Sequence, residues 1–172
     1  MRRISILVLA VTFLWLLGSR TVWAQKSEDK EHAELAKALK DAKVSLEKGL
    51  SASESQGKPI SGKFEVEDGK LQLSVYTMKG DKFSEVIVDH KTGKIAKAEA
   101  ITGGDDLTAA KAQSGAMAKA KLSLSGATEK AVKANNGYRA VSVTPSLKDG
   151  HPVAEVTLVK GAEFKTASEK LD

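Results

Sequence analysis

Apolar residues between positions 33 and 50 recur at the spacing of one helix face. Leu35, Leu39, Ala42, Leu46 and Leu50 lie three or four positions apart, so they form a single stripe that a helix can bury. The preceding residues 25–32 are mostly charged and carry no such stripe. We therefore predict a helix over residues 33–50, preceded by a segment that is frayed or helical only towards its end.

A candidate break lies inside this helix. Ser45 can cap a second helical segment that begins at Leu46, with Glu47 favourably placed in its first turn. The sequence leaves open whether residues 43–45 interrupt the helix or belong to one long helix. Gly57 and Pro59 predict its end in either case.

The apolar period then changes from the helical value to two. Around position 74, for example, Leu73 and Val75 alternate with Ser74 and Tyr76, which indicates a strand with one buried and one wet face. Dipeptides such as Asp68-Gly69 favour tight hairpins because glycine accepts positive φ. The pattern predicts an antiparallel meander with strands at residues 60–67, 71–78, 83–88 and 95–100.

The second part of the chain repeats this order. Residues 102–106 contain two glycines and two aspartates and mark a boundary. Helical segments are predicted at 107–120, which is rich in alanine, and at 126–134. Strands are then expected at residues 140–145, 153–160 and 163–168.

Residues 43–83 and 121–164 are two versions of one pattern. Landmark glycines and phenylalanines, such as Gly57 and Gly137 or Phe83 and Phe164, keep an offset of 78 to 81 positions. A period of this length points to two small domains and not to a solenoid. The predicted fold class is α+β, with two tandem domains at 25–102 and 103–172, each a helix packed on an antiparallel sheet.

The first 24 residues have the character of a signal peptide. Arg2 and Arg3 precede an apolar run at residues 4–17, and Val22-Trp23-Ala24 suits a cleavage site. The run is shorter than the roughly 20 residues of a spanning helix, although an uncleaved anchor is the alternative. We predict export and cleavage after Ala24, with no stable membrane anchor afterwards.

Charge and cysteine content narrow the function classes. The formal net charge of +5 falls to +2 without Arg2, Arg3 and Arg20, and Arg139 is the remaining arginine. Nucleic-acid binders cluster their cations and favour arginine, so nucleic-acid binding is not expected. The chain has no cysteine, which excludes thiol chemistry. These features favour a periplasmic protein, or one that is secreted.

Parts of both copies resemble a known family. The motif Asp89-His90-Lys91-Thr92-Gly93-Lys94, after a helix and three strands, resembles the close of a PepSY domain, and residues 149–156 are similar to the middle hairpin of that family. The second copy lacks the Thr-Gly-Lys turn. The resemblance implies a helix packed on an antiparallel sheet in secreted or envelope proteins. It also implies a link to the inhibition or restraint of a protease, without a motif that identifies an inhibitory site.

Candidate chemistry is sparse. His32, His90 and His151 lack the spacing of a zinc site, so we interpret them as solvated residues. Equivalent turns could nevertheless bring His90 and His151 together. The sequence shows no nucleophile elbow and no phosphate-binding loop, and the Asp-Gly turns lack the ligands of a calcium loop. We predict that the protein is not an enzyme and uses no cofactor or metal.

Tyr76 and Tyr138 are the aromatic residues best suited to contact a partner, and we add His90 and His151 as candidate contact residues. Alternatively, the tyrosines cover a sheet edge or the seam between the copies. Our hypothesis is an exported, non-catalytic binding or regulatory protein that acts through contact with another protein. The first alternative is an inhibitor or regulator of a secreted or periplasmic peptidase, and the second is a periplasmic carrier of a small molecule or metal ion.

Overall fold

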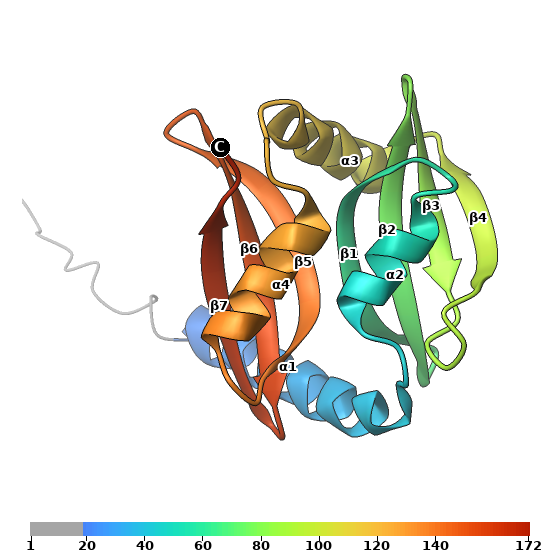
Figure 1. Cartoon of the computed structure of the whole chain (residues 1–172). Coiled ribbons are helices and arrows are strands. Elements are labelled where there is room, and N and C mark those ends of the chain that lie inside the picture. The colour runs from blue at the N-terminus through green and yellow to red at the C-terminus, as the bar shows by residue number, and fades with distance from the viewer. Residues whose placement is uncertain (1–18) are drawn as a thin grey trace, which may run out of the picture.

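The protein is an α+β structure with one antiparallel sheet of seven strands (Figure 1). The computed structural model describes residues 19–172, with side chains from residue 29 onward. The helical elements are α1 (Ser19–Ala38), the short 3-10 helix η1 (Leu39–Asp41), α2 (Leu46–Ser53), α3 (Gly104–Met117) and α4 (Leu124–Ala134). The strands are β1 (Lys58–Glu67), β2 (Lys70–Lys79), β3 (Lys82–Val88), β4 (Ile95–Ile101), β5 (Arg139–Lys148), β6 (His151–Lys160) and β7 (Glu163–Lys170).

The two halves of the chain join in the middle of the sheet. The strand order is β4-β3-β2-β1-β5-β6-β7, so each half forms its own meander and the first strands of the two meanders pair. This seam is short, with Gly62 opposite Val143 and Lys63 opposite Ser142. A Cβ at Gly62 would lie 3.0 Å from Leu50 Cδ2, so the glycine lets α2 pack closely over the seam.

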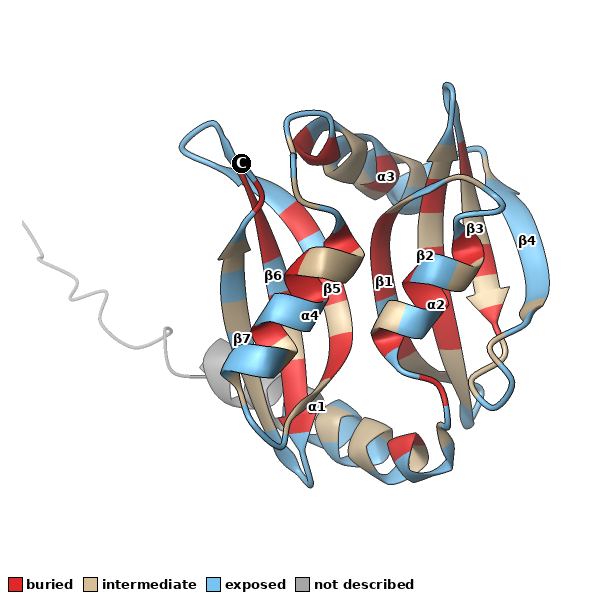
Figure 2. Ribbon diagram, in the orientation of Figure 1, coloured by how far each residue is buried: buried red, intermediate tan, exposed pale blue. Residues whose placement is uncertain are grey.

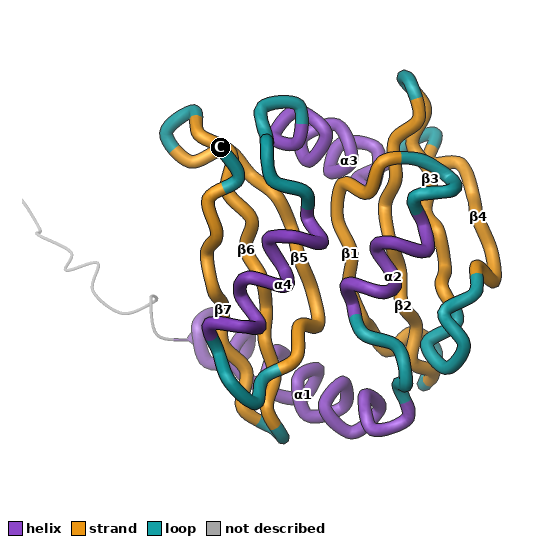
Figure 3. Tube along the Cα trace, in the orientation of Figure 1, coloured by secondary structure: helices purple, strands orange, loops and turns teal. Residues whose placement is uncertain are grey.

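Equivalent local contacts recur in both halves. Ser45 accepts a hydrogen bond from the backbone N–H of Lys48 at the start of α2, and Ser123 accepts one from Gly126 at the start of α4. The predicted cap at Ser45 is therefore confirmed. Since both caps begin helices that lie over the sheet, the repeated sequence pattern corresponds to a repeated scaffold (Figure 3).

The four α-helices divide between the two faces of the sheet. Helices α2 and α4 lie side by side on one face, here called the front face (Figure 1). On the opposite back face, α3 binds Ser61 through Gln113, and His32 of α1 stacks on Phe164 of β7 with ring centroids 4.0 Å apart. Helices α1 and α3 therefore cross the back face.

The apolar core continues through both halves. Leu46 and Leu50 from α2 and Leu158 from β6 are fully buried, and Leu124 from α4 is 2% exposed. These side chains belong to one cluster of buried residues. Figure 2 shows the result: the central strands β1 and β5 each carry several buried residues, whereas β4 at the edge is exposed along most of its length.

The predicted helix over residues 33–50 is broken. Helix α1 ends at Ala38 and η1 follows, after which Ala42 is extended with ψ 122°. Residues 43–45 therefore interrupt the helix, and α2 begins afresh at Leu46. The expectation of a frayed segment at 25–32 is wrong because α1 includes those residues. Their lysine, glutamate and glutamine residues have a high helix propensity that outweighs the missing apolar stripe.

The other predicted elements are confirmed with small changes at their ends. All four strands of the first half and all three of the second are present, including β7. Strand β5 extends three residues past Pro145, to the hairpin at Asp149. Helix α3 begins at Gly104 and ends at Met117, three residues earlier than predicted.

The N-terminal prediction lies largely outside the described residues. The apolar run at residues 4–17 precedes Ser19, where α1 begins, so export and cleavage after Ala24 stay predictions. Within the part of the chain that the structure describes, no helix has the length and apolar character needed to cross a membrane.

Candidate functional site

The two halves meet at two related corners. At one, the start of β1 passes the end of α3, and the Lys58 ammonium donates to the Met117 carbonyl at 3.3 Å. At the other, the start of β5 passes η1, and Arg139 Nη1 donates to the Leu39 carbonyl at 3.2 Å. Carbonyls at helix ends lack partners within the helix and attract cations. Each half thus adds a cationic donor to a carbonyl at the end of a helix from the other half.

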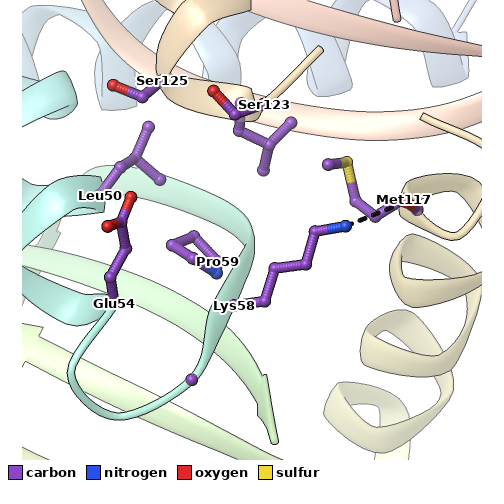
Figure 4. A pocket seen from close by; sticks show the side chains of 9 residues that line it. Leu50, Glu54, Lys58, Pro59, Met117, Ser123 and Ser125 are labelled. Carbon is purple, nitrogen blue, oxygen red and sulfur yellow. Dashed lines mark hydrogen bonds between the residues drawn. The ribbon is translucent and has the colours of Figure 1, made fainter. Parts of the chain in front are cut away.

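The first corner contains a small pocket of about 240 Å³, which we call the front pocket (Figure 4). Its walls come from α2 and β1 of the first half and from α3 and α4 of the second. Leu50, Pro59 and Met117 give it an apolar surface, with the Lys58 and Glu54 side chains beside them. The residues that line it are Leu50, Glu54, Gly57, Lys58, Pro59, Met117, Ser123, Leu124 and Ser125.

Local sequence explains how this pocket forms. Gly57 has φ 159°, and a Cβ there would lie 2.7 Å from the Met78 carbonyl oxygen, so the turn from α2 into β1 needs glycine. On the other side, Ser123 caps α4 and places Ser125 in the first turn, beside the pocket. The pocket is therefore a product of two helix boundaries, one from each half.

The second corner contains a larger pocket of about 450 Å³, which we call the basic pocket. It lies where η1, the start of β5 and the turn between β6 and β7 come together. Three cationic residues take part, and no carboxylate does. The lining residues are Ala36, Leu39, Lys40, Gly137, Tyr138, Arg139, Val159, Lys160 and Gly161.

Arg139 links the basic pocket to the core. Its Nη2 atom donates to the Val44 carbonyl at 3.2 Å, and its guanidinium carbon lies 5.4 Å from the centre of the Phe64 ring. The side chain is half-buried. Burial lowers the pKa of the Arg139 guanidinium, and the charge of Glu47 opposes this shift.

Tyr138 lies in a cationic environment within the basic pocket. The Lys165 ammonium is 3.9 Å from the centre of its ring and the Lys160 ammonium is 5.8 Å away, distances suited to cation–π contacts. A hydrogen bond with Glu163, together with burial, raises the pKa of the Tyr138 hydroxyl. This predicted contact residue therefore lies in a pocket, where two lysines approach its ring.

Tyr76 occupies a different position, on the back face. As predicted, it lies on the face opposite Val75, and its hydroxyl donates to Asp106 Oδ1 of α3 at 2.7 Å. Burial and this hydrogen bond raise the pKa of Tyr76 above its usual range. It lines a hollow of about 220 Å³ under α3. Tyr76 thus ties the sheet of the first half to a helix of the second half.

The structure does not bring His90 and His151 together. His90 follows β3 and His151 begins β6, with β2, β1 and β5 between them, which is four strand spacings or roughly 19 Å. The Nδ1 atom of His90 is buried without a hydrogen-bond partner, whereas His151 Nδ1 lies 2.8 Å from Asp172 Oδ2. Among residues 19–172, no group of three or more potential ligands could hold a metal ion.

Residues 89–94, the motif that carries the family resemblance, form a turn that the Asp89 side chain organises. Asp89 Oδ1 accepts hydrogen bonds from the Lys91 N–H at 3.0 Å, the Thr92 N–H at 2.7 Å and the Thr92 hydroxyl at 2.9 Å. These bonds lower the pKa of Asp89. Gly93 completes the turn with φ 75°. The side chains of this motif thus shape the connection between β3 and β4.

Sequence reasoning missed the basic pocket. Arg139 and Leu39 are 100 positions apart, and no periodicity joins residues so distant. The available signal was Arg139 itself, because it is the one arginine that remains after residues 1–24. Arginine is preferred over lysine where one cation must bond several acceptors at once.

Comparisons with protein-family models, with curated proteins and with solved structures gave no match to this chain.

Proposed function

We propose that this protein is an exported, non-catalytic binding protein, composed of two PepSY-like domains, that acts through contact with another protein. The front pocket is the proposed contact point, where it receives one apolar side chain of the partner. The observation that carries this proposal is an apolar pocket built jointly by the two halves and open at the surface.

The size of the front pocket favours a side chain over a free ligand. Pockets for drug-sized molecules hold roughly 300 to 1,000 Å³, whereas this one holds about 240 Å³. An apolar anchor in a small pocket, with polar groups around it, is the usual arrangement at the centre of a protein interface. Lys58 and Glu54 supply such polar groups here.

The tandem-domain part of the proposal is supported by matching contacts. The carbonyl of His90, after β3, accepts from the backbone N–H of Val44 at 3.0 Å. The carbonyl of Leu171, after β7, accepts a hydrogen bond from the backbone N–H of Leu122 at 2.9 Å. Each contact joins the chain after the third strand of a half to the residues before its capped helix. The first half continues into β4, which has no counterpart in the second.

Filling the front pocket tests the proposal. Ser125→Tyr places a ring at the pocket, and Lys133→Tyr places the same ring near the other end of α4, where the Lys133 side chain is 79% exposed. In affinity capture from the envelope fraction of the native cells, we expect one partner to be retained by the wild type and by Lys133→Tyr. Its recovery should fall at least tenfold with Ser125→Tyr.

Equal recovery with both variants would remove the front pocket as the contact point. The same three proteins, added to peptidases from that fraction, test the peptidase-regulator alternative. If the protein regulates a peptidase through this pocket, the wild type and Lys133→Tyr should slow substrate cleavage. Ser125→Tyr should not. Circular dichroism and thermal unfolding establish that each variant is folded.

A further inference from the structure

The basic pocket gathers cations from three separate elements. Lys40 comes from η1 in the first half, while Arg139 and Lys160 come from β5 and β6 in the second half. The ion pairs found among residues 19–172 involve none of the three. The fold therefore concentrates positive charge in a hollow without providing a neutralising carboxylate in its lining.

The fold holds one of these charges, the Arg139 guanidinium, in a fixed position. Its two terminal nitrogens each donate to a backbone carbonyl, and its guanidinium faces the Phe64 ring. Burying a cation costs free energy unless an anion or acceptors compensate for the lost water. The two carbonyl dipoles offset part of this cost but carry no net negative charge that would neutralise the guanidinium. The nearby carboxylates, Glu47 and Glu163, influence Arg139 and Tyr138 respectively, and neither lines the pocket.

The remaining walls are apolar. Leu39 and Val159 are each 4% exposed, and the Tyr138 ring and Ala36 stand beside them. The volume of about 450 Å³ lies within the range of roughly 300 to 1,000 Å³ for small-molecule sites. Such a pocket can take an apolar body as well as a charged group.

We propose that the basic pocket binds a small organic anion whose carboxylate or phosphate meets Lys40 and Lys160 while its apolar body lies against Leu39, Val159 and Tyr138. Arg139 positions the wall through its bonds to the Leu39 and Val44 carbonyls and contributes its charge to the field. The Lys160 ammonium lies close to Gly137 and over the Tyr138 ring, so it can turn towards an anion without moving the backbone.

The first half provides a matched control for this site. Lys79 precedes Gly80 at the end of β2 in the same way that Lys160 precedes Gly161 at the end of β6, and both lysines are exposed. Lys79 does not line the basic pocket. Its replacement removes the same net charge from an equivalent hairpin and leaves the proposed site intact.

Nuclear magnetic resonance titration of the purified protein tests the proposal. The probes are phenyl phosphate, benzoate, inorganic phosphate and neutral benzyl alcohol, all at constant ionic strength. We expect saturable shifts of the Gly137, Tyr138 and Gly161 amides with phenyl phosphate or benzoate, and at least tenfold weaker binding of inorganic phosphate and benzyl alcohol. Whichever of phenyl phosphate and benzoate binds with the lower Kd shows whether the site prefers phosphate or carboxylate.

Variants complete the test. Lys160→Gln alone should raise the Kd for the preferred anion several-fold, and its combination with Lys40→Gln should raise it at least tenfold. Lys79→Gln, which removes the same charge as Lys160→Gln, should leave the Kd within twofold of the wild type. Thermal unfolding checks that each variant is folded. The proposal is overturned if neither aromatic anion gives saturable shifts at these amides. The proposal would likewise be refuted if the double variant bound the anion as tightly as the wild type, or if Lys79→Gln weakened binding as much as the double variant.

Discussion

The front pocket and the basic pocket occupy corresponding corners of the two halves, yet their chemistry differs. In both, a cation at the start of a strand donates to a carbonyl at the end of a helix from the other half. At the front pocket this cation is an exposed lysine, and the surroundings are apolar. At the basic pocket it is a half-buried arginine joined by two lysines. The two corners therefore share the contact between halves and differ in the surfaces beside it.

Replacing the two linking cations should separate their contributions most clearly. Arg139→Ala removes two bonds to buried carbonyls and the contact with Phe64, so we expect a loss of about 2–4 kcal/mol in the free energy of unfolding. Lys58→Ala removes one bond at an exposed site and should cost roughly 0–1 kcal/mol. Urea unfolding measures both. Similar losses would show that the two corners are equally important for stability.

The helix caps should have equal effects on stability in the two halves, because the cap contact is the same in both. Ser45→Ala and Ser123→Ala each remove an acceptor for a backbone N–H at the start of a helix, and each should cost about 1 kcal/mol. Their effects should agree within about 0.5 kcal/mol in urea unfolding. A large disagreement would mean that one helix depends far more on its cap than on packing.

A smaller effect concerns the turn that the first half alone contains. Because hydrogen bonds lower the pKa of Asp89 in the folded protein, the carboxylate stabilises the fold above its ordinary pKa of 3.8. This stabilisation is lost as the pH falls through the lowered value. Asp89→Asn keeps an acceptor oxygen but cannot titrate, so the dependence of the thermal midpoint on pH between 2 and 5 should become shallower. An unchanged pH profile would contradict this account.

Much of the fold was predictable because its signals are local. The Asp68-Gly69 turn and the cap at Ser45 each involve residues a few positions apart, and both appear in the structure as expected. The alternation around Ser74 correctly indicated a strand. Its expected wet face is wrong at Ser74, which is 1% exposed because α3 covers that face. The frayed segment at 25–32 was mispredicted for the opposite reason. A missing apolar stripe was given more weight than the helix propensity of its residues.

The candidate sites were much less predictable. Tyr138 was singled out as an aromatic contact residue, but nothing near it in sequence indicated that Lys40 and Leu39 would lie beside it. The hypothesis of adjacent turns at His90 and His151 could not include the strand order, which places three strands between them. Each site depends on pairs of residues tens of positions apart, which sequence periodicity does not connect.

By itself, the sequence determined the strands, the hairpins, the capped helices α2 and α4, and the repeated order of elements, since short-range sterics, capping and hydrophobic period decide these features. The tertiary structure decided that the two meanders pair through β1 and β5 in one sheet, and that Lys58 and Arg139 reach across to helices of the other half. Those outcomes depend on how Gly62 lets α2 approach the seam and on which helix-end carbonyls packing brings within reach of each cation. Such contacts come into being only when both halves fold against each other.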